Sequence, residues 1–587
     1  MALEGIPRIV VAADGVRLHV TEHGDPGRPT VVLVHGYPDT SAVWDGVVAE
    51  LVPHLHVVTY DVRGAGASDR PRRTRAYRLP QLAADLHAVA GSVSPGRPVH
   101  VIAHDWGSMQ SWQPITEAEA PATFASFTSI SGPAWDHVGL ALRRRLSRPT
   151  PRNLATVLSQ LRRSWYMTAF QLPLLPALFW RIGTGGRVAH RLQKAEGLPR
   201  VAGYPAPTQR LDGAVGTRLY RANLLPRLLR PAVRATTVPV QVILPMRDRY
   251  MHPRLQDDLA RWTDRLWVRR VHAGHWVPLS NPGLVARAAR ELIDHVEGAP
   301  EPRSLRRHRV GRADRDKAFA DRLVLVTGAG SGIGRQTALC FAERGAEVVC
   351  VDLDGVHAAH TATLASRVGP PAHSYQVDVS DADAMAALAK TVQVEHGTPD
   401  VVVNNAGIGI AGPFLETGVD DWQRILDVNL LGVVHGCRLF GAQLVERGEG
   451  GHLVNLASLA AFLPQRNLPA YSTTKAAVLM LSECLRGELS SYGIGVSAIC
   501  PGVVKTGITS ATRFVGLSEE EQTEKRRRVT KGYARRNYGP EKVALAIVKA
   551  VEKDIPVVPV TPEAHIGAAL ARLSPPAARA FARIDLP

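Results

Sequence analysis

The sequence is poor in cysteine. It holds five cysteines among 587 residues, all in the second half of the chain, and no two of them form a C-x-x-C pair. This spacing argues against a metal or redox site built on cysteine, and we expect reduced, buried thiols in a cytoplasmic protein. The five positions are Cys340, Cys350, Cys437, Cys484 and Cys500.

Two further absences concern membranes and export. No run of about 18 uncharged apolar residues occurs, so the sequence predicts no membrane-spanning helix. The first residues, MALEGIPRIV, contain neither the basic stretch nor the apolar core that directs secretion. Both absences favour a cytoplasmic location.

Acidic residues are outnumbered by basic ones. The chain carries 70 Lys and Arg against 53 Asp and Glu, a formal net charge of +17. No nucleic-acid recognition module accompanies this charge, so we expect no nucleic-acid partner. The composition of a GC-rich genome is the simpler explanation for an Arg-rich chain, and peripheral contact with an anionic membrane surface stays open as the alternative.

The chain is too long for one core, and its pattern predicts two α/β domains. Short apolar runs alternate with helical stretches throughout, which is typical of parallel sheets with crossover helices. In the first half this rhythm breaks at about 133–232, a helical stretch rich in Arg, Leu and Pro. We expect a helical cap there, within an α/β domain at 1–298. A polar, basic linker is predicted at 299–318 and a Rossmann-type doubly wound domain at 319–587.

The first candidate site centres on Asp105, in VHVIAHDWGS. A side chain exposed on a sharp turn from strand to helix needs small neighbours, and Ala103 and Gly107 supply them. A serine here would indicate an esterase. An aspartate indicates attack on an sp³ carbon, which gives an alkyl-enzyme ester.

Two candidate partners follow Asp105 in the chain order of α/β-hydrolase triads. Asp248 comes after the run VPVQVIL, and His275 comes after the next predicted strand, in AGHW. This order predicts a histidine base that an acid orients. The acid loop LPMRD lacks the glycine often found there, so Asp264 is the alternative acid.

An oxyanion hole is predicted next to the nucleophile. Gly36 in HGYPD permits a tight turn, and the following N–H of Tyr37, together with that of Trp106, can stabilise negative charge on oxygen.

These motifs resemble those of the epoxide hydrolases with an α/β-hydrolase fold. HGYP, HDWG, the late acid and GHW all match. The resemblance implies that two cap tyrosines hold the epoxide oxygen, and the candidates are Tyr166 in SWYMTAFQLP and Tyr220 in RLYRANLL. It implies a two-step hydrolysis to a vicinal diol, in which water cleaves the Asp105 ester. The Leu- and Phe-rich cap indicates an apolar, lipid-like substrate.

Two other interpretations of the first half stay open. Haloalkane dehalogenases share the aspartate nucleophile but generally bind the halide with Trp or Asn donors, and Tyr37 stands where such an Asn would sit. Alternatively, this half binds lipid without catalysis, and only the second half is an enzyme.

The second candidate site begins with a glycine-rich turn. In RLVLVTGAGSGIG, Gly328, Gly332 and Gly334 follow an apolar run and let the backbone approach a pyrophosphate at a helix N-terminus. Asp352 ends the next apolar run, where a carboxylate can accept both ribose hydroxyls and would repel a 2′-phosphate. Ser331, rather than a basic residue, stands in the glycine turn. The sequence therefore favours NAD over NADP.

A Tyr-Lys pair supplies the chemistry of this half. Tyr471 and Lys475 lie four residues apart in YSTTK, on one helix face. A lysine charge beside the phenol lets it exchange a proton with an alcohol near neutral pH. Ser458, thirteen positions before Tyr471, can hold the same oxygen.

These residues resemble the short-chain dehydrogenase/reductase family over 319–560. The resemblance adds Asn429 to the catalytic set and implies hydride transfer between a secondary alcohol or ketone and NAD. It also implies a homo-oligomer formed through this domain. The cofactor-binding residues that it implies are Gly328, Ser331, Gly332, Ile333, Gly334, Asp352, Asp378, Val379, Asn405, Ala406, Tyr471, Lys475, Pro501, Gly502, Val504 and Thr506.

The whole layout resembles actinobacterial proteins that fuse an epoxide hydrolase to a short-chain dehydrogenase. A diol is itself a secondary alcohol, so the two reactions can lie on one substrate line. The alternative is a pair of enzymes with unrelated substrates.

Overall fold

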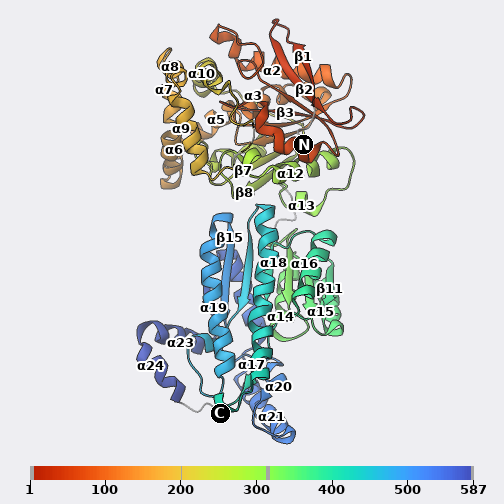
Figure 1. Ribbon diagram of the computed structural model, residues 1–587, viewed down its shortest axis with the longest axis vertical. Coiled ribbons are helices and arrows are strands. Elements are labelled where there is room, and N and C mark those ends of the chain that lie inside the picture. The colour runs from red at the N-terminus through yellow and green to blue at the C-terminus, as the bar shows by residue number, and fades with distance from the viewer. Residues whose placement is uncertain (1–4, 200, 202, 312–316, 584–587) are drawn as a thin grey trace. The chain divides into compact units, whose positions relative to one another are not determined.

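The computed structural model describes residues 5–199, 201, 203–311 and 317–583, and the chain divides into two compact units, Met1–Arg312 and Ala313–Pro587 (Figure 1). Each unit has a mainly parallel sheet with helices on both faces. The prediction of two α/β units is confirmed.

The N-terminal unit is built on an eight-stranded sheet with the order β1-β2-β4-β3-β5-β6-β7-β8. β2 pairs antiparallel with both β1 and β4. The other pairs, which join β4, β3, β5, β6, β7 and β8 in that order, are parallel. Every residue of β3, β4, β5 and β7 is buried, which explains their continuous apolar runs. The strands are β1 (Ile6–Val11), β2 (Arg17–His23), β3 (Thr30–Val34), β4 (His56–Tyr60), β5 (Val99–His104), β6 (Phe124–Ile130), β7 (Val240–Pro245) and β8 (Leu266–Val271).

Helices cover both faces of this sheet. α2 and α3 pack on one face, and α1 and α12 pack on the other. The helices of this part are α1 (Asp45–Leu51), α2 (Leu79–Val93), α3 (Trp106–Ile115), α4 (Ala120–Thr123), α11 (Val277–Ser280), α12 (Pro282–Val296) and α13 (Arg303–Arg306).

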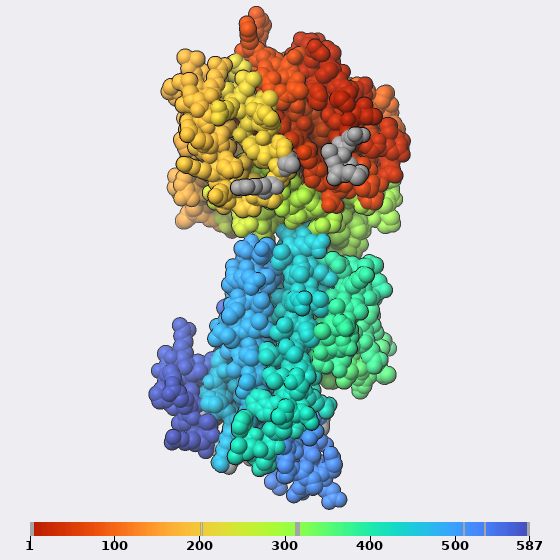
Figure 2. Space-filling model, in the orientation of Figure 1, coloured from red at the N-terminus to blue at the C-terminus, as the bar shows by residue number. Residues whose placement is uncertain are grey.

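The stretch between β6 and β7 is helical, as the sequence predicts. Its residues form a lobe that is orange to yellow in Figure 2. The cap helices are α5 (Trp135–Leu146), α6 (Pro151–Arg163), α7 (Trp165–Ala169), α8 (Leu175–Arg181), α9 (Thr184–Ala195) and α10 (Gln209–Leu229).

The C-terminal unit has a seven-stranded parallel sheet with the order β11-β10-β9-β12-β14-β15-β17. A separate pair joins β13 (Ile410–Ala411) to β16 (Arg513–Phe514). The strands of the main sheet are β9 (Leu323–Thr327), β10 (Glu347–Asp352), β11 (Ala372–Gln376), β12 (Val401–Asn404), β14 (Gly451–Leu456), β15 (Ile494–Cys500) and β17 (Val557–Pro559).

The helices of this unit pack in two layers. α14, α15 and α22 cover one face of the sheet, and α16, α18 and α19 cover the other. The helices are α14 (Gly332–Glu343), α15 (Gly355–Val368), α16 (Ala382–Glu395), α17 (Val419–Leu426), α18 (Gly432–Arg447), α19 (Pro469–Leu489), α20 (Ile508–Ala511), α21 (Glu519–Arg536), α22 (Pro540–Lys553), α23 (Pro562–Leu573) and α24 (Pro575–Ala580).

Two details differ from the sequence-based expectations. Part of the linker predicted at 299–318 packs on the N-terminal unit: the N–H of Val268 donates to the carbonyl of His308, and Leu305 is buried beside Trp267. Residues 312–316 of that linker lie outside the described residues. The expectation of buried thiols is wrong for Cys484, which is exposed on α19, while the other four cysteines are buried. Helical periodicity places Cys484 on the outer face of α19.

One helical stretch among the described residues, Val419–Arg447, has the length and apolarity of a membrane span by composition alone, with a mean hydropathy of 1.3. Its second half, α18, buries Val433, Cys437, Phe440 and Leu444 against the sheet of its own unit. It therefore serves as a core helix of this fold.

Candidate active sites

Asp105 stands at the turn between β5 and α3. Its backbone has φ 50° and ψ −123°, a left-handed conformation that is strained for a non-glycine residue. A Cβ added at Gly107 would lie 2.2 Å from the carbonyl oxygen of Val34, and one at Gly36 would lie 2.6 Å from the Asp105 Cβ. The crowding explains why glycine flanks this aspartate.

The loops after β7 and β8 bring Asp248 and His275 to Asp105. His275 Nδ1 lies 3.0 Å from Asp248 Oδ2, and His275 Nε2 lies 3.6 Å from Asp105 Oδ1. The backbone N–H groups of Tyr250 and Met251 donate to Asp248 Oδ1 at 2.7 and 3.1 Å, which fixes the acid. Asp248, and not Asp264, therefore contacts the histidine.

The charges of this group are coupled. Burial alone would raise the pKa of Asp105, but the hydrogen bond and charge of His275 lower it below its ordinary value. Burial alone would lower the pKa of His275, but Asp248 and Asp105 on its two sides raise it well above its ordinary value. The lowered pKa of Asp105 and the raised pKa of His275 favour a carboxylate beside an imidazolium.

The predicted oxyanion donors lie at the nucleophile. The N–H of Tyr37 donates to Asp105 Oδ2 at 2.9 Å. Trp106 is the first residue of α3, and its buried ring packs 4.9 Å from the ring of Tyr220. A donor already directed at a carboxylate oxygen can stabilise charge that develops there.

The cap brings Tyr166 and Tyr220 together near Asp105. Their ring centroids lie 6.0 Å apart, and Tyr220 lies 5.5 Å from the ring of Tyr37. Burial, with the nearby Asp105 carboxylate, raises the pKa of both phenols well above the ordinary value. Both hydroxyls therefore stay protonated and can donate hydrogen bonds.

Two residues near the histidine carry no recognisable sequence signal. Glu196, the C-cap of α9, accepts a hydrogen bond from the backbone N–H of His275 at 2.8 Å. The Tyr250 ring packs against the His275 ring at 4.6 Å. Glu196 ends a polar cap helix, so only the fold brings it to the catalytic loop.

The cap also contacts the loop that carries Tyr37. The Tyr204 hydroxyl donates to Asp39 Oδ1 at 2.6 Å, and the Trp276 indole N–H donates to Asp39 Oδ2 at 3.2 Å. Burial raises the pKa of Asp39. These contacts tie the cap to both loops that surround the nucleophile.

The glycine-rich turn of the C-terminal unit leaves room close to the backbone. Gly328 and Gly332 have φ values of 63° and 51°, and a Cβ at Gly334 would lie 2.0 Å from the Gly328 carbonyl oxygen. Ser331 precedes α14 as its N-cap, followed by Ile333 in its first turn. This close turn before a helix fits a dinucleotide pyrophosphate.

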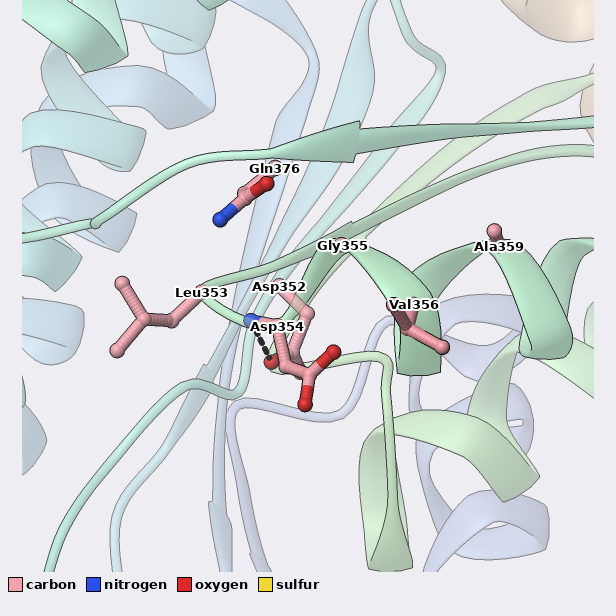
Figure 3. A pocket seen from close by; sticks show the side chains of 7 residues that line it. All are labelled: Asp352, Leu353, Asp354, Gly355, Val356, Ala359 and Gln376. Atoms are coloured by element: carbon pink, nitrogen blue, oxygen red, sulfur yellow. Dashed lines mark hydrogen bonds between the residues drawn. The ribbon is translucent and has the colours of Figure 1, made fainter.

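Asp352 ends β10 beside this turn. Its Oδ2 accepts from the N–H of Gly330 at 2.7 Å, and its Oδ1 accepts from the N–H of Asp354 at 3.0 Å. It borders an open hollow with Leu353, Asp354 and Gln376 (Figure 3). The carboxylate is thus fixed at the edge of the dinucleotide turn.

The other predicted cofactor residues lie at neighbouring strand ends. Asp378 follows β11 and accepts from the N–H and hydroxyl of Ser380, and the buried Val379 packs against Gly432. The Asn405 side chain donates to the carbonyl of Thr327 at 2.9 Å, and the N–H of Ala406 donates to the Thr327 hydroxyl.

The Tyr-Lys pair lies on α19, as predicted. Lys475 Nζ lies 5.7 Å from the Tyr471 ring centroid and donates to the Leu456 carbonyl at 2.8 Å. Burial lowers the pKa of Lys475 to about 8. Ser458 is buried at the end of β14, where its Oγ accepts from the N–H of Ala460 at 3.2 Å.

Asn429 lies in a π-helical turn between α17 and α18. Its Oδ1 accepts from the N–H of Ile408 at 2.8 Å and its Nδ2 donates to the Ile408 carbonyl. A Cβ at Gly407 would lie 3.1 Å from Asn429 Oδ1 and 3.5 Å from Lys475 Nζ, so these two groups border one small space. Such turns are frequent at functional sites.

The loop after β15 completes this site. Thr506 approaches the glycine turn, because a Cβ at Gly332 would lie 3.3 Å from Thr506 Cβ. Val504 is buried, Pro501 accepts from the N–H of Leu459, and Gly502 lies against Glu563. The charged stretch that follows forms α21.

Comparison with known proteins finds a matching family for each of the two parts of the chain. The alpha/beta hydrolase fold family matches residues 29–282, and the short chain dehydrogenase family matches residues 322–514. The "Probable oxidoreductase EphD" of Mycobacterium tuberculosis is 44% identical over 590 residues, which cover 99% of each chain. The chain belongs to the EphD family.

Other relatives of this EphD-family protein match its C-terminal unit. The "C alpha-dehydrogenase" of Sphingobium sp. is 32% identical over 43% of this chain and 84% of that protein. A short-chain dehydrogenase/reductase from Burkholderia phymatum, solved in complex with NAD, is 30% identical, with a TM-score of 0.41, over 43% of this chain and 93% of that one. The EphD-family chain is an enzyme with hydrolase and oxidoreductase domains, and the second uses a nicotinamide cofactor.

Proposed function

We propose that the N-terminal unit hydrolyses an epoxide to a vicinal diol and that the C-terminal unit transfers hydride between a secondary alcohol or ketone and NAD. The observation that carries the first half is the contact of the Asp105 carboxylate with His275, close to two neighbouring cap phenols. These groups match the two needs of epoxide opening, a carboxylate nucleophile and an acid for the departing oxygen.

In the first step, Asp105 attacks an epoxide carbon and the carbon–oxygen bond on that carbon breaks. The leaving oxygen is an alkoxide, a far stronger base than a phenolate. Tyr166 and Tyr220 are protonated in their buried surroundings, so they can hold the oxygen and give it a proton. The product is an ester between Asp105 and the substrate.

In the second step, His275 activates water to cleave this ester. Ester formation removes the negative charge of Asp105, one of the two charges that raise the pKa of His275. The His275 imidazolium can then return a proton to the phenolate left by the first step, and the neutral imidazole acts as a base while Asp248 holds its Nδ1 side. The N–H of Tyr37 is directed at the ester oxygen that gains charge.

The paired phenols favour an epoxide over a haloalkane. A halide leaves as a weak base and needs no proton, so two buried hydroxyl donors suit an alkoxide better. Tyr37 has no side-chain amide like that of the Asn which binds the halide in dehalogenases. Its hydroxyl already donates to the Gly213 carbonyl at 2.9 Å and is not directed at a halide.

In the C-terminal unit, Tyr471 exchanges a proton with the alcohol oxygen, and Ser458 holds that oxygen. Lys475 is buried beside the Tyr471 ring, where its charge stabilises the phenolate. The nicotinamide, when bound, accepts or supplies the hydride. Asp352 favours NAD, because its carboxylate would repel the 2′-phosphate of NADP.

We propose an apolar, lipid-like substrate and contact of the cap with an anionic membrane surface. The cap exposes apolar side chains on α6, α7 and the α7–α8 loop, including Leu158, Trp165 and Leu174, on a lobe with basic helix ends such as Arg162 and Arg181. Exposed apolar groups among arginines suit an interface with anionic lipid.

The test is a screen of fatty and aromatic epoxides that follows diol and NADH together. Wild-type enzyme with NAD should form diol first and NADH afterwards. Asp105→Ala should form neither from the epoxide yet still oxidise added diol, and Tyr471→Phe should accumulate diol without NADH. Oxidation of other alcohols, but never of the diol made by its own first unit, would overturn the single substrate line. A complete lack of diol would leave the first unit as a binding module.

A further inference from the structure

Three potential metal ligands meet in the C-terminal unit, at the end of the sheet opposite to the cofactor turn. They are Glu347, the first residue of β10, His373 on β11, and His396, the C-cap of α16. Asp352 lies at the other end of β10, roughly 17 Å away along the strand. This group therefore takes no direct part in the redox site.

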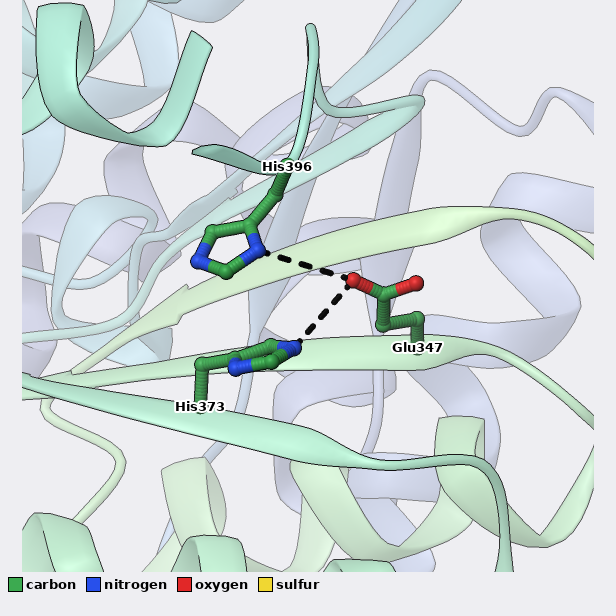
Figure 4. A group of neighbouring side chains, drawn as sticks. All are labelled: Glu347, His373 and His396. Atoms are coloured by element: carbon green, nitrogen blue, oxygen red, sulfur yellow. Dashed lines mark ion pairs between the residues drawn. The ribbon is translucent and has the colours of Figure 1, made fainter. Parts of the chain in front are cut away.

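The three side chains point toward one another (Figure 4). Glu347 Oε1 lies 3.3 Å from His373 Nε2 and 3.8 Å from His396 Nδ1, and the three ligand atoms all lie within 4.8 Å of one another. A tetrahedral zinc ion with bonds of about 2.0–2.1 Å separates its ligand atoms by about 3.3–3.4 Å. The Glu347–His373 distance matches this value, the Glu347–His396 distance exceeds it by about 0.4 Å, and the two histidine atoms lie within 4.8 Å, so the side chains would draw together to enclose an ion.

We infer that Glu347, His373 and His396 bind a divalent ion of the zinc type, with a fourth position open to water. Two imidazoles and one carboxylate oxygen suit Zn²⁺, Co²⁺ or Ni²⁺. They offer too few oxygen ligands for Ca²⁺ or Mg²⁺. The side chain of His373 is 34% exposed, which leaves solvent access, whereas that of His396 is 11% exposed.

A second layer of contacts prepares His396 as a ligand. The Tyr375 hydroxyl donates to Glu395 Oε2 at 2.6 Å and lies 2.7 Å from His396 Nε2. Because this hydroxyl donates its one hydrogen to Glu395, it is placed to accept from an Nε2–H of His396. Metal-binding histidines commonly donate their second N–H in this way.

This tautomer leaves a lone pair on His396 Nδ1, facing the Glu347 carboxylate. The His373 and His396 rings are also stacked, with centroids 4.0 Å apart and planes at 29°. A cation between Nδ1 of His396 and the Glu347 carboxylate would be attracted to both groups. The ion would join the edge strand β11 and the end of α16 to β10, so we infer a structural clamp that is independent of either reaction.

The test uses full-length, tag-free protein stripped with a chelator and then titrated with Zn²⁺ by calorimetry and with Co²⁺ by absorption. Wild type should bind one equivalent more Zn²⁺ than the double variant His373→Gln, His396→Gln, and should show the visible bands of tetrahedral Co²⁺. Tyr375→Phe should weaken Zn²⁺ binding by about 10-fold, as loss of an outer partner does. His360→Gln, which removes an exposed histidine of α15, is the matched control and should match wild type.

Retained alcohol oxidation shows that each variant is folded. Equal Zn²⁺ stoichiometry and equal Co²⁺ spectra in wild type and the double variant would overturn the inference. They would identify an ion-free cluster in which a protonated His396 pairs with Glu347.

Discussion

The two catalytic centres of the chain are held together in different ways. In the N-terminal centre, the carboxylates and the imidazole contact one another directly, and Asp105, Asp248 and His275 are all less than a tenth exposed. In the C-terminal centre, Lys475, Ser458 and Asn429 are held by main-chain groups.

The difference follows from what each centre lacks before substrate arrives. In the proposed reaction the hydrolase centre contains its nucleophile, base and acid, and two carboxylates already flank one imidazole before substrate arrives. The dehydrogenase centre holds its side chains around the space of a cofactor that supplies the hydride chemistry. We therefore expect side-chain changes to disturb the pKa values of the first centre, and changes near the glycine turn to alter the cofactor choice of the second.

The largest expected effect comes from removing both cap phenols. The double variant Tyr166→Phe, Tyr220→Phe should lose at least about 10³-fold in epoxide hydrolysis, because no acid meets the leaving oxygen. Diol formation measures this loss, and alcohol oxidation by the same preparation should not change. Tyr77→Phe removes a buried hydroxyl that donates to the Pro71 carbonyl and should keep the hydrolysis rate. Full activity of the double variant would refute the proposed acids.

Changing Asp352 should relax the cofactor choice of the second centre. Asp352→Ser removes the carboxylate that would repel a 2′-phosphate, so the preference for NAD over NADP should fall by about 30-fold. The ratio of kcat/KM with NAD to kcat/KM with NADP measures this preference. Asp378→Ser, at the next strand end, should leave that ratio unchanged. An unaltered ratio in Asp352→Ser would show that another residue selects the cofactor.

Glu196 is expected to position the catalytic histidine. Glu196→Ala removes the acceptor of the His275 N–H and should slow hydrolysis by about 10-fold. Glu196→Gln keeps an oxygen acceptor and should recover most of the rate. Equal losses in both variants would instead indicate that the charge itself matters, which a shifted pH profile of hydrolysis would reveal.

The smallest expected effect is a gain in stability. Burial lowers the pKa of Lys475 from 10.5 to about 8, so holding its charge at pH 7 costs the folded unit about 3 kcal/mol. Lys475→Met loses the hydrogen bond to Leu456 and should still raise the free energy of unfolding by about 1 kcal/mol at pH 7. The cost is complete below pH 8 and disappears as the pH rises from 8 to 10.5, so the gain should disappear with it.

Denaturant unfolding of the C-terminal unit at pH 7 and at pH 10.5 measures this difference. Lys549→Met, which removes an exposed lysine of α22, is the control and should change neither value. A destabilised Lys475→Met at pH 7 would show that the lysine is a structural group as well as a catalytic one.

The sequence predicted residues that lie at strand ends and missed those that depend on packing. Asp105, Asp248 and His275 each follow an apolar run, and the carboxyl ends of parallel strands meet at one edge of a sheet. Glu196 reaches His275 only through the arrangement of the cap helices. Its side chain carries no motif, so no spacing rule could have found it.

The Glu347 cluster shows the same limit in the other unit. Its three members come from two strands and a helix end, and they meet only because β10 and β11 pair in one register. A single-residue shift of that register would turn His373 to the other face of the sheet.

The placement of the nucleophile on the sheet and of the phenols on the cap has a stereochemical consequence for the proposed reaction. An epoxide held between them is attacked from the face opposite its departing oxygen, so the attacked carbon inverts. The oxygen atom that this attack adds to the substrate comes from the Asp105 carboxylate and leaves with the diol. Water attacks the carbonyl carbon of the ester, so the oxygen of water enters the carboxylate of Asp105 and not the diol. In heavy-oxygen water, the first diol that each enzyme molecule releases should therefore be unlabelled at the attacked carbon.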